Sequence, residues 1–348
     1  MVTRKKPTIV DVARAAGVSV GSASNVLNRT RFVSDEIREK VLRTADELQY
    51  FANPLAQTLR RKRSGVICFC TTSVTTVYLR SLADALDAVA TSHGFELVQV
   101  LTHADPAREL ARVRSQIGRQ VDGLLLLPSL EPQESLDAIA LSETPCVVLD
   151  RYVDDDRFSC VAFDNQKTMR EITRLILASG HERILFVAQN LSVITTRHRI
   201  EGLKQEMLSA GLSLRDCLII QKDETQYFYA KTLVKIFDSP TRPTAIIAGN
   251  SKVAIETIRQ LKLMNIRWPE DVSLASFDNP EWAEILPIQL STVDSPIDAM
   301  AQAAWAMLSE KMRVLGASRR VRWIDSTFIL RDSVQPPPIK GGLIRSGT

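Results

Sequence analysis

Polar and charged side chains follow several apolar runs of the chain, at the points where the strands of an α/β fold would end. Ligands of parallel α/β folds bind at the carboxyl ends of strands. Carboxylates and amides hydrogen-bond to hydroxyl groups, and an arginine can hold a carboxylate or phosphate through two parallel hydrogen bonds. We therefore expect a site for a small polar ligand, although a capping or turn role is equally open for each residue alone. The candidates are Thr72 and Ser73, Asp150 and Arg151, Asp164 and Asn165, Asn250 and Ser251, and Asp278 and Asn279.

No arrangement typical of catalysis or metal binding occurs in the sequence. The chain has no phosphate-binding GKS or GKT loop, no GxGxxG after the first expected strand and no GxSxG nucleophile elbow. Its four histidines, His93, His103, His181 and His198, lack the spacing of metal ligands. We expect no cofactor, no metal and no enzymatic activity. For His181, just after a helical stretch, we expect a structural role in which a positive charge complements the helix dipole.

A second set of small polar residues lies in the stretch TIVDVARAAGVSVGSASNVLN, from Thr8 to Asn28, which predicts two short helices and a tight turn. Thr8 and Asp11 have the spacing of a capping box, and Gly17 allows the backbone conformation that ends a helix. Ser19 then caps the second helix. The apolar positions that recur at helical spacing, and that we expect to face inward, are Val12, Ala13, Ala16, Val20, Ala23, Val26 and Leu27.

The outward residues of the second helix are suited to contact DNA. They are Gly21, Ser22, Ser24, Asn25 and Arg29. Small polar residues let a helix approach base edges and phosphates closely, and asparagine can form two hydrogen bonds with adenine. An ordinary helical hairpin is the alternative, but a third helix capped by Ser34 would complete a small three-helix core. Its inner face is predicted to be Ile37, Val41, Leu42, Ala45 and Leu48.

Charge is distributed unevenly along the 348 residues. Residues 1–63 hold 13 lysines and arginines against 6 acidic residues, whereas the remaining residues hold 31 against 34. A basic head on a slightly acidic body indicates that a polyanion binds the head alone.

Residues 51–64 are expected to form a hinge between head and body. Asn53 and Pro54 suit the cap and first position of a short helix. The basic residues 60–63 repel one another, so this helix should form only when phosphates neutralise them and a partner covers its apolar side chains. Those side chains are Leu55, Ala56 and Leu59, of which Leu59 is suited to act as a wedge in a minor groove. A solvated basic linker is an equally open interpretation.

The body alternates short apolar runs with helical stretches, which predicts parallel sheets covered by helices on both faces. The number of runs exceeds one ordinary sheet, so we expect two α/β lobes. The predicted strands are 66–70, 95–101, 121–127, 146–150, 160–163, 184–188, 217–221, 245–248 and 272–277.

The composition, 45% apolar and 24% charged, is typical of a globular protein. No run of about 18 apolar residues occurs and the N-terminus lacks an apolar signal region, so we expect a cytoplasmic protein that does not interact with membranes. The odd number of cysteines, all within apolar runs, predicts reduced core residues. They are Cys68, Cys70, Cys146, Cys160 and Cys217.

The head and hinge together resemble the lactose-repressor (LacI/GalR) family of bacterial transcription regulators. The resemblance rests on Thr8 to Asn28, Val33-Ser34-Asp35, Tyr50 and the run from Asn53 to Arg60, and it continues to about residue 333. It implies a homodimer on a near-palindromic operator, with Val20, Gly21 and Asn25 reading bases. Because the family usually has arginine where this chain has Asn25, we expect adenine instead of guanine at that contact. The complete predicted DNA-contact set is Thr8, Ser19, Val20, Gly21, Ser22, Ser24, Asn25, Asn28, Arg29, Asn53, Leu55, Ala56 and Leu59.

For the body, the resemblance implies a two-lobed periplasmic-binding-protein-like core with an effector in the cleft. It implies crossings between lobes near Phe163, Thr292 and Trp323. The domains are then a helix-turn-helix head (1–50), the hinge (51–64), a first lobe (about 65–163 and 293–323), a second lobe (about 164–292 and 324–333) and a disordered tail (334–348). Family positions add Tyr78, Arg199 and a lid, Trp282. The complete predicted effector set is Thr72, Ser73, Tyr78, Arg151, Arg199, Asn250, Asp278 and Trp282.

These predictions combine into a ligand-responsive repressor of a carbohydrate or sugar-acid catabolic operon. The effector would be a sugar, a sugar acid or a phosphosugar, and Arg151 with Arg199 favours an anionic one. Effector binding would alter lobe closure and so the spacing of the two hinges on double-stranded DNA. The alternatives are an α/β sugar-modifying enzyme with a DNA-binding head and a sugar-transport protein, which the basic head disfavours.

Overall fold

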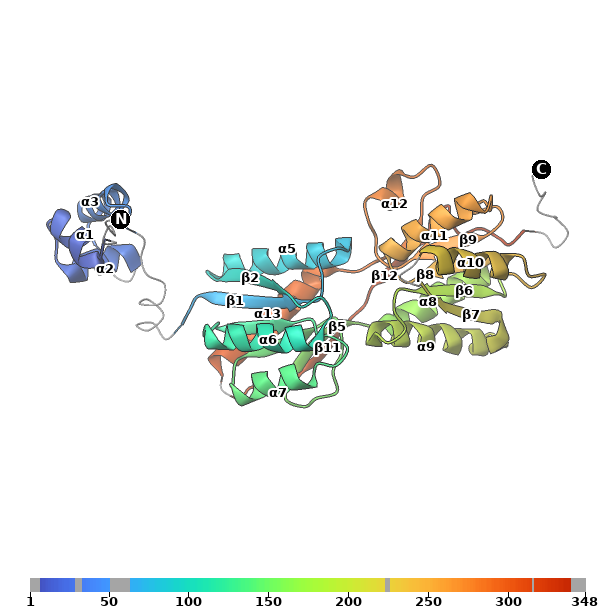
Figure 1. Cartoon of the computed structure of the whole chain (residues 1–348), viewed down its shortest axis with the longest axis horizontal. Coiled ribbons are helices and arrows are strands. Elements are labelled where there is room, and N and C mark those ends of the chain that lie inside the picture. Colours follow the sequence, from blue (N-terminus) through green and yellow to red (C-terminus); the bar gives the residue numbers. More distant parts are fainter. Residues whose placement is uncertain (1–6, 29–32, 51–62, 223–225, 315, 339–348) are drawn as a thin grey trace. The chain divides into compact units, whose positions relative to one another are not determined.

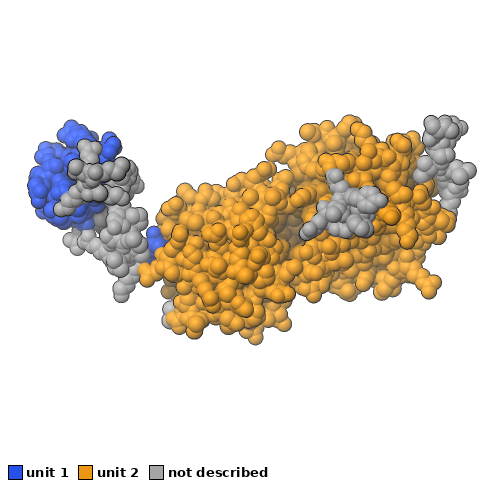
Figure 2. Space-filling model, viewed as in Figure 1, with its two compact units in different colours: residues 1–64 blue, residues 65–348 orange. Residues whose placement is uncertain are grey.

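The computed structural model describes residues 7–28, 33–50, 63–222, 226–314 and 316–338 (Figure 1). The chain divides into two compact units, Met1–Ser64 and Gly65–Thr348 (Figure 2). Each unit has a hydrophobic core of its own.

The first unit contains three helices: α1 (Ile9–Ala15), α2 (Val20–Asn28) and α3 (Asp35–Glu47). The capping box of α1 is confirmed, since the Thr8 amide donates to Asp11 Oδ2 at 2.9 Å and the Asp11 amide donates to Thr8 Oγ1. Gly17 follows with a φ of +62°, a left-handed conformation that costs glycine little. The core of the unit consists of Val12, Ala13, Ala16, Ala23, Val26, Val41 and Ala45.

Four predicted orientations in this unit are wrong. Val20, Leu42 and Leu48 were expected inside, but they are 44%, 50% and 37% exposed. Val20 begins α2, Leu42 is one residue, about 100° around the helix, from the buried Val41, and Leu48 lies beyond the last turn of α3. Ser24 was expected outside and is buried.

The first lobe of the second unit is a six-stranded, all-parallel sheet in the order β11-β5-β4-β3-β1-β2 (Figure 1). Helices α5 and α13 pack on one face, and α6 and α7 on the other. The elements are β1 (Val66–Thr71), α5 (Val77–Ser92), β2 (Glu96–Leu101), α6 (Pro106–Gly118), β3 (Gly123–Leu126), α7 (Gln133–Leu141), β4 (Cys146–Leu149), β5 (Ser159–Phe163), α13 (Ile297–Arg313) and β11 (Val321–Ile324).

The second lobe is a six-stranded sheet in the order β12-β10-β9-β8-β6-β7, in which only the β10–β12 pair is antiparallel. Helices α8 and α9 pack on one face, and α10 and α11 on the other. The elements are α8 (Asn165–Ala178), β6 (Ile184–Ala188), α9 (Ile194–Ser209), η1 (Leu214–Asp216), β7 (Cys217–Gln221), α10 (Gln226–Phe237), β8 (Ala245–Ala248), α11 (Ser251–Leu263), β9 (Ser273–Ser276), α12 (Trp282–Ile285), β10 (Ser291–Asp294) and β12 (Thr327–Ile329).

The chain passes between the two sheets three times: after β5, between β10 and α13, and between β11 and β12. The second and third crossings were expected near Thr292 and Trp323, but both residues lie within strands, and the crossings follow at 295–296 and 325–326. All nine strands expected from apolar runs are present. Strands β10 to β12 were missed because their sequences, STVD, VRWI and TFI, contain polar residues, so no continuous apolar run marks them.

The predicted disorder of the tail is wrong for its first residues. Val334 is buried in the core of the second lobe, and the Gln335 amide donates to Ser273 Oγ at 3.0 Å. Residues 339–348 lie outside the described residues. The reduced, buried state of all five cysteines is confirmed. None of the described helices is long and apolar enough to cross a membrane.

His181 has the expected structural role but not the expected charge. Its Nε2 lies 2.8 Å from the Gln335 carbonyl oxygen, to which it can only donate, and its Nδ1 lies 2.9 Å from Thr244 Oγ1. Burial lowers the pKa of His181, so the neutral ring is the form that the fold stabilises.

The lowered pKa of His181 predicts a loss of stability in acid. Below the unfolded-state value of 6.5 the unfolded chain binds a proton that the folded chain resists, so stability falls as the pH drops through that value toward the folded pKa. The slope contributed by this residue is at most about 1.4 kcal/mol per pH unit. Urea unfolding between pH 7 and pH 5 should show a shallower decline for His181→Gln than for the wild type. Parallel pH profiles of the two proteins would contradict the assignment.

Helices α8 and α9 are packed closely at Gly202, where an added Cβ would lie 2.3 Å from the Gln166 carbonyl oxygen. Gly202→Ala should therefore destabilise the protein by about 1 to 3 kcal/mol through overpacking. Gly118→Ala, in α6 with nothing within 4 Å of the added atom, is the matched control and should be neutral or stabilising by up to about 1 kcal/mol. Urea unfolding measures both, and equal effects of the two substitutions would refute the close packing.

Candidate functional site

A cavity of about 240 Å³ lies in the second unit and is lined by residues of both lobes. Because the strands of each sheet are parallel, the loops that follow their carboxyl ends gather at one edge, and both sheets contribute such loops to the cavity. Six of the eight predicted effector residues line it: Thr72, Tyr78, Arg151, Arg199, Asn250 and Asp278.

Arg199, on α9, is held on three sides. Its Nε donates to Asn165 Oδ1 at 2.7 Å, its Nη1 donates to the Gly249 carbonyl oxygen at 2.5 Å, and its guanidinium lies 3.8 Å from the centre of the Phe277 ring. Burial lowers the pKa of Arg199, and the carboxylates of Asp278 and Asp150 oppose that effect. A cation in this position is therefore fixed in orientation before any ligand arrives.

Asp150 and Asp278 occupy equivalent positions in the two lobes, each just after a strand and each with a positive φ, of 64° and 68°. Asp150 Oδ1 accepts a hydrogen bond from the Tyr78 hydroxyl at 2.8 Å. Asp278 Oδ2 accepts from the amide and the hydroxyl of Ser251, each at 3.1 Å. Burial raises the pKa of Asp278, whereas the Ser251 amide and Arg199 lower it. Burial also raises the pKa of Tyr78 well above its usual value, and Asp150 adds to this effect.

Arg151 and Asn250 line the cavity while also bonding to the backbone. Arg151 Nη1 donates to the Pro128 carbonyl oxygen at 2.6 Å, and burial lowers the pKa of Arg151. Asn250 caps α11, since its Oδ1 accepts from the Val253 amide at 2.9 Å. Asn250 therefore both caps α11 and lines the cavity, two roles that were alternatives in the prediction from the sequence.

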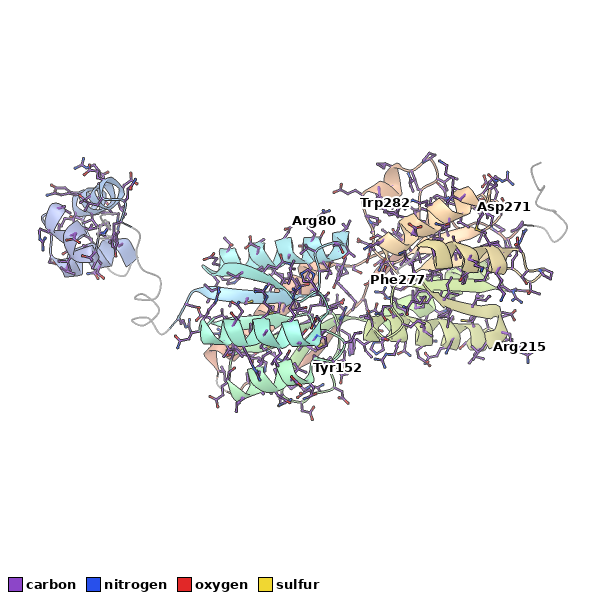
Figure 3. The ribbon with its side chains drawn as sticks, viewed as in Figure 1. Arg80, Tyr152, Arg215, Asp271, Phe277 and Trp282 are labelled. Atoms are coloured by element: carbon purple, nitrogen blue, oxygen red, sulfur yellow. The ribbon has the colours of Figure 1, made fainter. Side chains whose placement is uncertain are left out.

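Two predicted effector residues do not line the cavity. Ser73 turns its hydroxyl to Thr75, accepting from the Thr75 amide at 3.1 Å. Trp282 lies on α12 and packs partly against the core between the sheet and helices α10 and α11. Its role as a lid stays a prediction. In Figure 3, Phe277 lies where the two lobes meet, and Trp282 lies above it at the top of the second lobe.

Several lining residues were missed. Gln189 and Asn190 follow β6 directly, so the rule that placed Asp150 and Asp278 at strand ends could have found them. Ser295 and Ser326 lie in the second and third crossings and line the cavity with hydroxyls 3.0 Å apart. No local signal marks this pair because 31 positions separate them. Further lining residues that were missed are Thr76, Phe163, Thr168, Thr195, Thr196, Gly249 and Phe277, whereas Asn165 was among the predicted candidates.

The second candidate site is the outer face of α2 in the first unit. Val20 and Gly21 are exposed, and Ser22 and Asn25 are half-buried. Ser19 caps the helix by accepting from the Ser22 amide at 3.0 Å, and the Thr8 hydroxyl donates to Asp11 at 2.7 Å. The burial of Ser24 removes that residue from the expected outer face. Outside the described residues lie Arg29, Asn53, Leu55, Ala56 and Leu59, together with the side chain of Asn28.

Comparisons with known proteins find relatives of both units. Residues 8–53 match the family model for bacterial regulatory proteins of the lacI family, and residues 173–334 match a periplasmic binding protein-like domain. The transcriptional regulator DegA of Bacillus subtilis (strain 168) is 30% identical over 318 residues, which cover 90% of this chain and 92% of DegA. The transcriptional repressor PurR of Vibrio vulnificus (strain CMCP6) is 28% identical over 94% of this chain and 98% of PurR.

Among solved structures, a lac repressor dimer bound to operator and the anti-inducer ONPF has a TM-score of 0.82 at 22% identity, covering 95% of this chain and all of that chain. The chain belongs to the LacI family of bacterial regulatory proteins. It is a DNA-binding transcriptional repressor with an effector-binding core. The enzyme alternative is not supported, since these relatives are transcriptional regulators.

The position of Asn25 on α2 makes its role in base recognition testable. Asn25→Ala should weaken binding to the preferred operator by about 1 to 3 kcal/mol and relax selection at one base position, because a base contact is lost without a phosphate contact. Selection from random duplexes followed by fluorescence anisotropy would measure both effects. Leu42→Ala, at an exposed position of α3, is the control and should bind as the wild type does. An unchanged base preference in Asn25→Ala would exclude this contact.

Proposed function

We propose that the chain is a homodimeric repressor of a carbohydrate or sugar-acid catabolic operon. A small carbohydrate-like effector binds in the cavity between the lobes and either releases the repressor from its operator or holds it there. The observation that carries this proposal is the lining of the cavity, which draws polar side chains from both lobes and from two crossings. A ligand that contacts both lobes binds one lobe arrangement better than another, and only such a difference can shift the equilibrium.

A chain of contacts supports coupling between the cavity and the first crossing. Arg199 donates to Asn165 Oδ1, and Asn165 Nδ2 in turn donates to the Phe163 carbonyl oxygen at 3.1 Å. Phe163 ends β5 and Asn165 begins α8, so the peptide between them is the first crossing. A ligand that displaces the Arg199 guanidinium therefore acts on the segment about which the lobes would rotate.

The charges around the cavity favour a neutral sugar over a sugar acid or phosphosugar. The two arginines that suggested an anionic effector are accompanied by two carboxylates, Asp150 and Asp278, and both guanidiniums already donate to protein carbonyl groups. Hydroxyl and amide groups, including Thr72, Gln189 and Asn190, supply donors and acceptors suited to sugar hydroxyls.

Exposed apolar side chains on both lobes support dimerisation. Leu141 of α7 in the first lobe is 89% exposed, and Leu263 of α11 and Ile285 of α12 in the second lobe are 71% and 82% exposed. Large exposed apolar side chains can be covered at a protein interface. In a dimer, two heads would read the two halves of an operator through Val20, Gly21 and Asn25, with Leu59 as the minor-groove wedge. Operator DNA as the partner implies a cytoplasmic location.

Arg199→Ala tests the effector site. The substitution should abolish the effect of the effector on operator affinity and leave the affinity without effector within about twofold of the wild type, because the head is a separate unit. A thermal-shift screen of neutral sugars, sugar acids and phosphosugars identifies the effector, and fluorescence anisotropy with labelled operator measures the response. Arg215→Ala, at an exposed position of η1, is the matched control. A full response in Arg199→Ala would refute the site.

A further inference from the structure

Glu109 is a buried carboxylate that does not line the cavity. It lies on α6 in the first lobe with an exposed fraction of 0%, and its Oε2 accepts a hydrogen bond from the Ser129 amide at 2.5 Å. Burial raises the pKa of Glu109, whereas the Ser129 amide and Arg151 lower it. A buried carboxylate is rarely retained without a positive partner, so the position of Arg151 is informative.

Arg151 reaches toward the same segment from the cavity. Its Nη1 donates to the carbonyl oxygen of Pro128, the residue that precedes Ser129. Arg151 therefore bonds to the carbonyl oxygen, and Glu109 to the amide, of the peptide group that joins Pro128 and Ser129. These two groups point in opposite directions in a trans peptide, so the loop after β3 lies between the two charges. The other titratable groups that face Glu109 are the thiols of Cys70 and Cys146, and burial raises the pKa of Cys146 to about 12, so that this thiol stays neutral.

With Glu109 included, the charges in and behind the cavity are no longer balanced. When all three carboxyl groups are ionised, Asp150, Asp278 and Glu109 supply three negative charges, against two positive charges on Arg151 and Arg199. Charges separated by a buried loop are screened much less than charges in solvent, so Glu109 acts on whatever ligand approaches Arg151.

We propose that Glu109 is a specificity-determining residue of the effector site, which acts through Arg151. As a second, buried counter-charge of this arginine beside Asp150, it prevents Arg151 from serving as an anion site and so selects neutral ligands over anionic ones. This role rests on the proposed effector function of the cavity. It assigns to α6 a part in ligand selection, although no atom of Glu109 lines the cavity.

Sulfate is a suitable probe because its charge does not change near neutral pH. Calorimetry at constant ionic strength should show that Glu109→Gln, which keeps the acceptor for Ser129 and removes the charge, binds sulfate about tenfold more tightly than the wild type. The gain should be absent from the double variant E109Q/R151Q, and Glu109→Asp, which restores a carboxylate, should return the affinity toward that of the wild type. Equal sulfate affinity of Glu109→Gln and the wild type, including no measurable binding by either, would overturn the proposal. So would a gain that persists without Arg151, since it would show that the anion binds elsewhere.

A second measurement does not depend on ligand binding or on the Glu109 variants. In Arg151→Gln the buried carboxylate loses its counter-charge, so its pKa rises further above the unfolded value. A carboxyl group with a raised folded pKa destabilises the fold increasingly as the pH rises through that range. The difference in melting temperature between the wild type and Arg151→Gln should therefore widen from pH 5 to pH 8, and a constant difference would overturn the pairing. If the protein responds to an effector but fails these tests, the proposed function stands and only the role of Glu109 is refuted.

Discussion

The effector-binding core is arranged around the half-buried guanidinium of Arg199, which is held in place by oxygens of the protein. Desolvation of an arginine is costly unless carbonyl or carboxylate oxygens replace water. Here the oxygens come from Asn165 of α8 and Gly249 after β8, and the Phe277 ring after β9 covers one face of the cation. Three separate segments of the second lobe thus converge on a single side chain. The close approach of α8 and α9 at Gly202 lies on the same two helices.

The same constraint connects ligand binding to lobe movement. Asn165, which accepts from Arg199, also donates to the last residue of the first lobe before the crossing. The second and third crossings meet at the hydroxyls of Ser295 and Ser326, which line the same cavity. All three connections between the lobes therefore lie next to the cavity. A ligand there can bias the lobe arrangement through direct contacts, without a long pathway through the protein.

The head is stabilised by local contacts more than the lobes are. Its core is small and built mostly from alanine and valine, so local interactions matter more for it than for the lobes. The capping box of Thr8 and Asp11 and the left-handed Gly17 fix the ends of α1, and the Ser19 cap fixes the start of α2. These contacts join residues only three positions apart, which is why they could be predicted from the sequence. Inward and outward positions were predicted less well, as Val20, Leu48 and Ser24 show, because the neighbouring helices decide what is covered.

Local spacing by itself determined the capped starts of α1 and α2, nine strands of the body, the reduced cysteines and the polar residues at strand ends, because each of these features depends on neighbours within a few positions. The predicted Ser34 cap of α3 is wrong, since its side chain makes no capping hydrogen bond. Only the tertiary structure decided which strand-end residues meet. It placed Thr72, Asp150 and Asp278 around one cavity, excluded Ser73 and Trp282, and set the buried Glu109 behind Arg151. The physical reason is that these relations depend on the packing of segments far apart in the chain, and on the desolvation that this packing imposes on their charges. The spacing of residues along the sequence predicts neither this packing nor this desolvation.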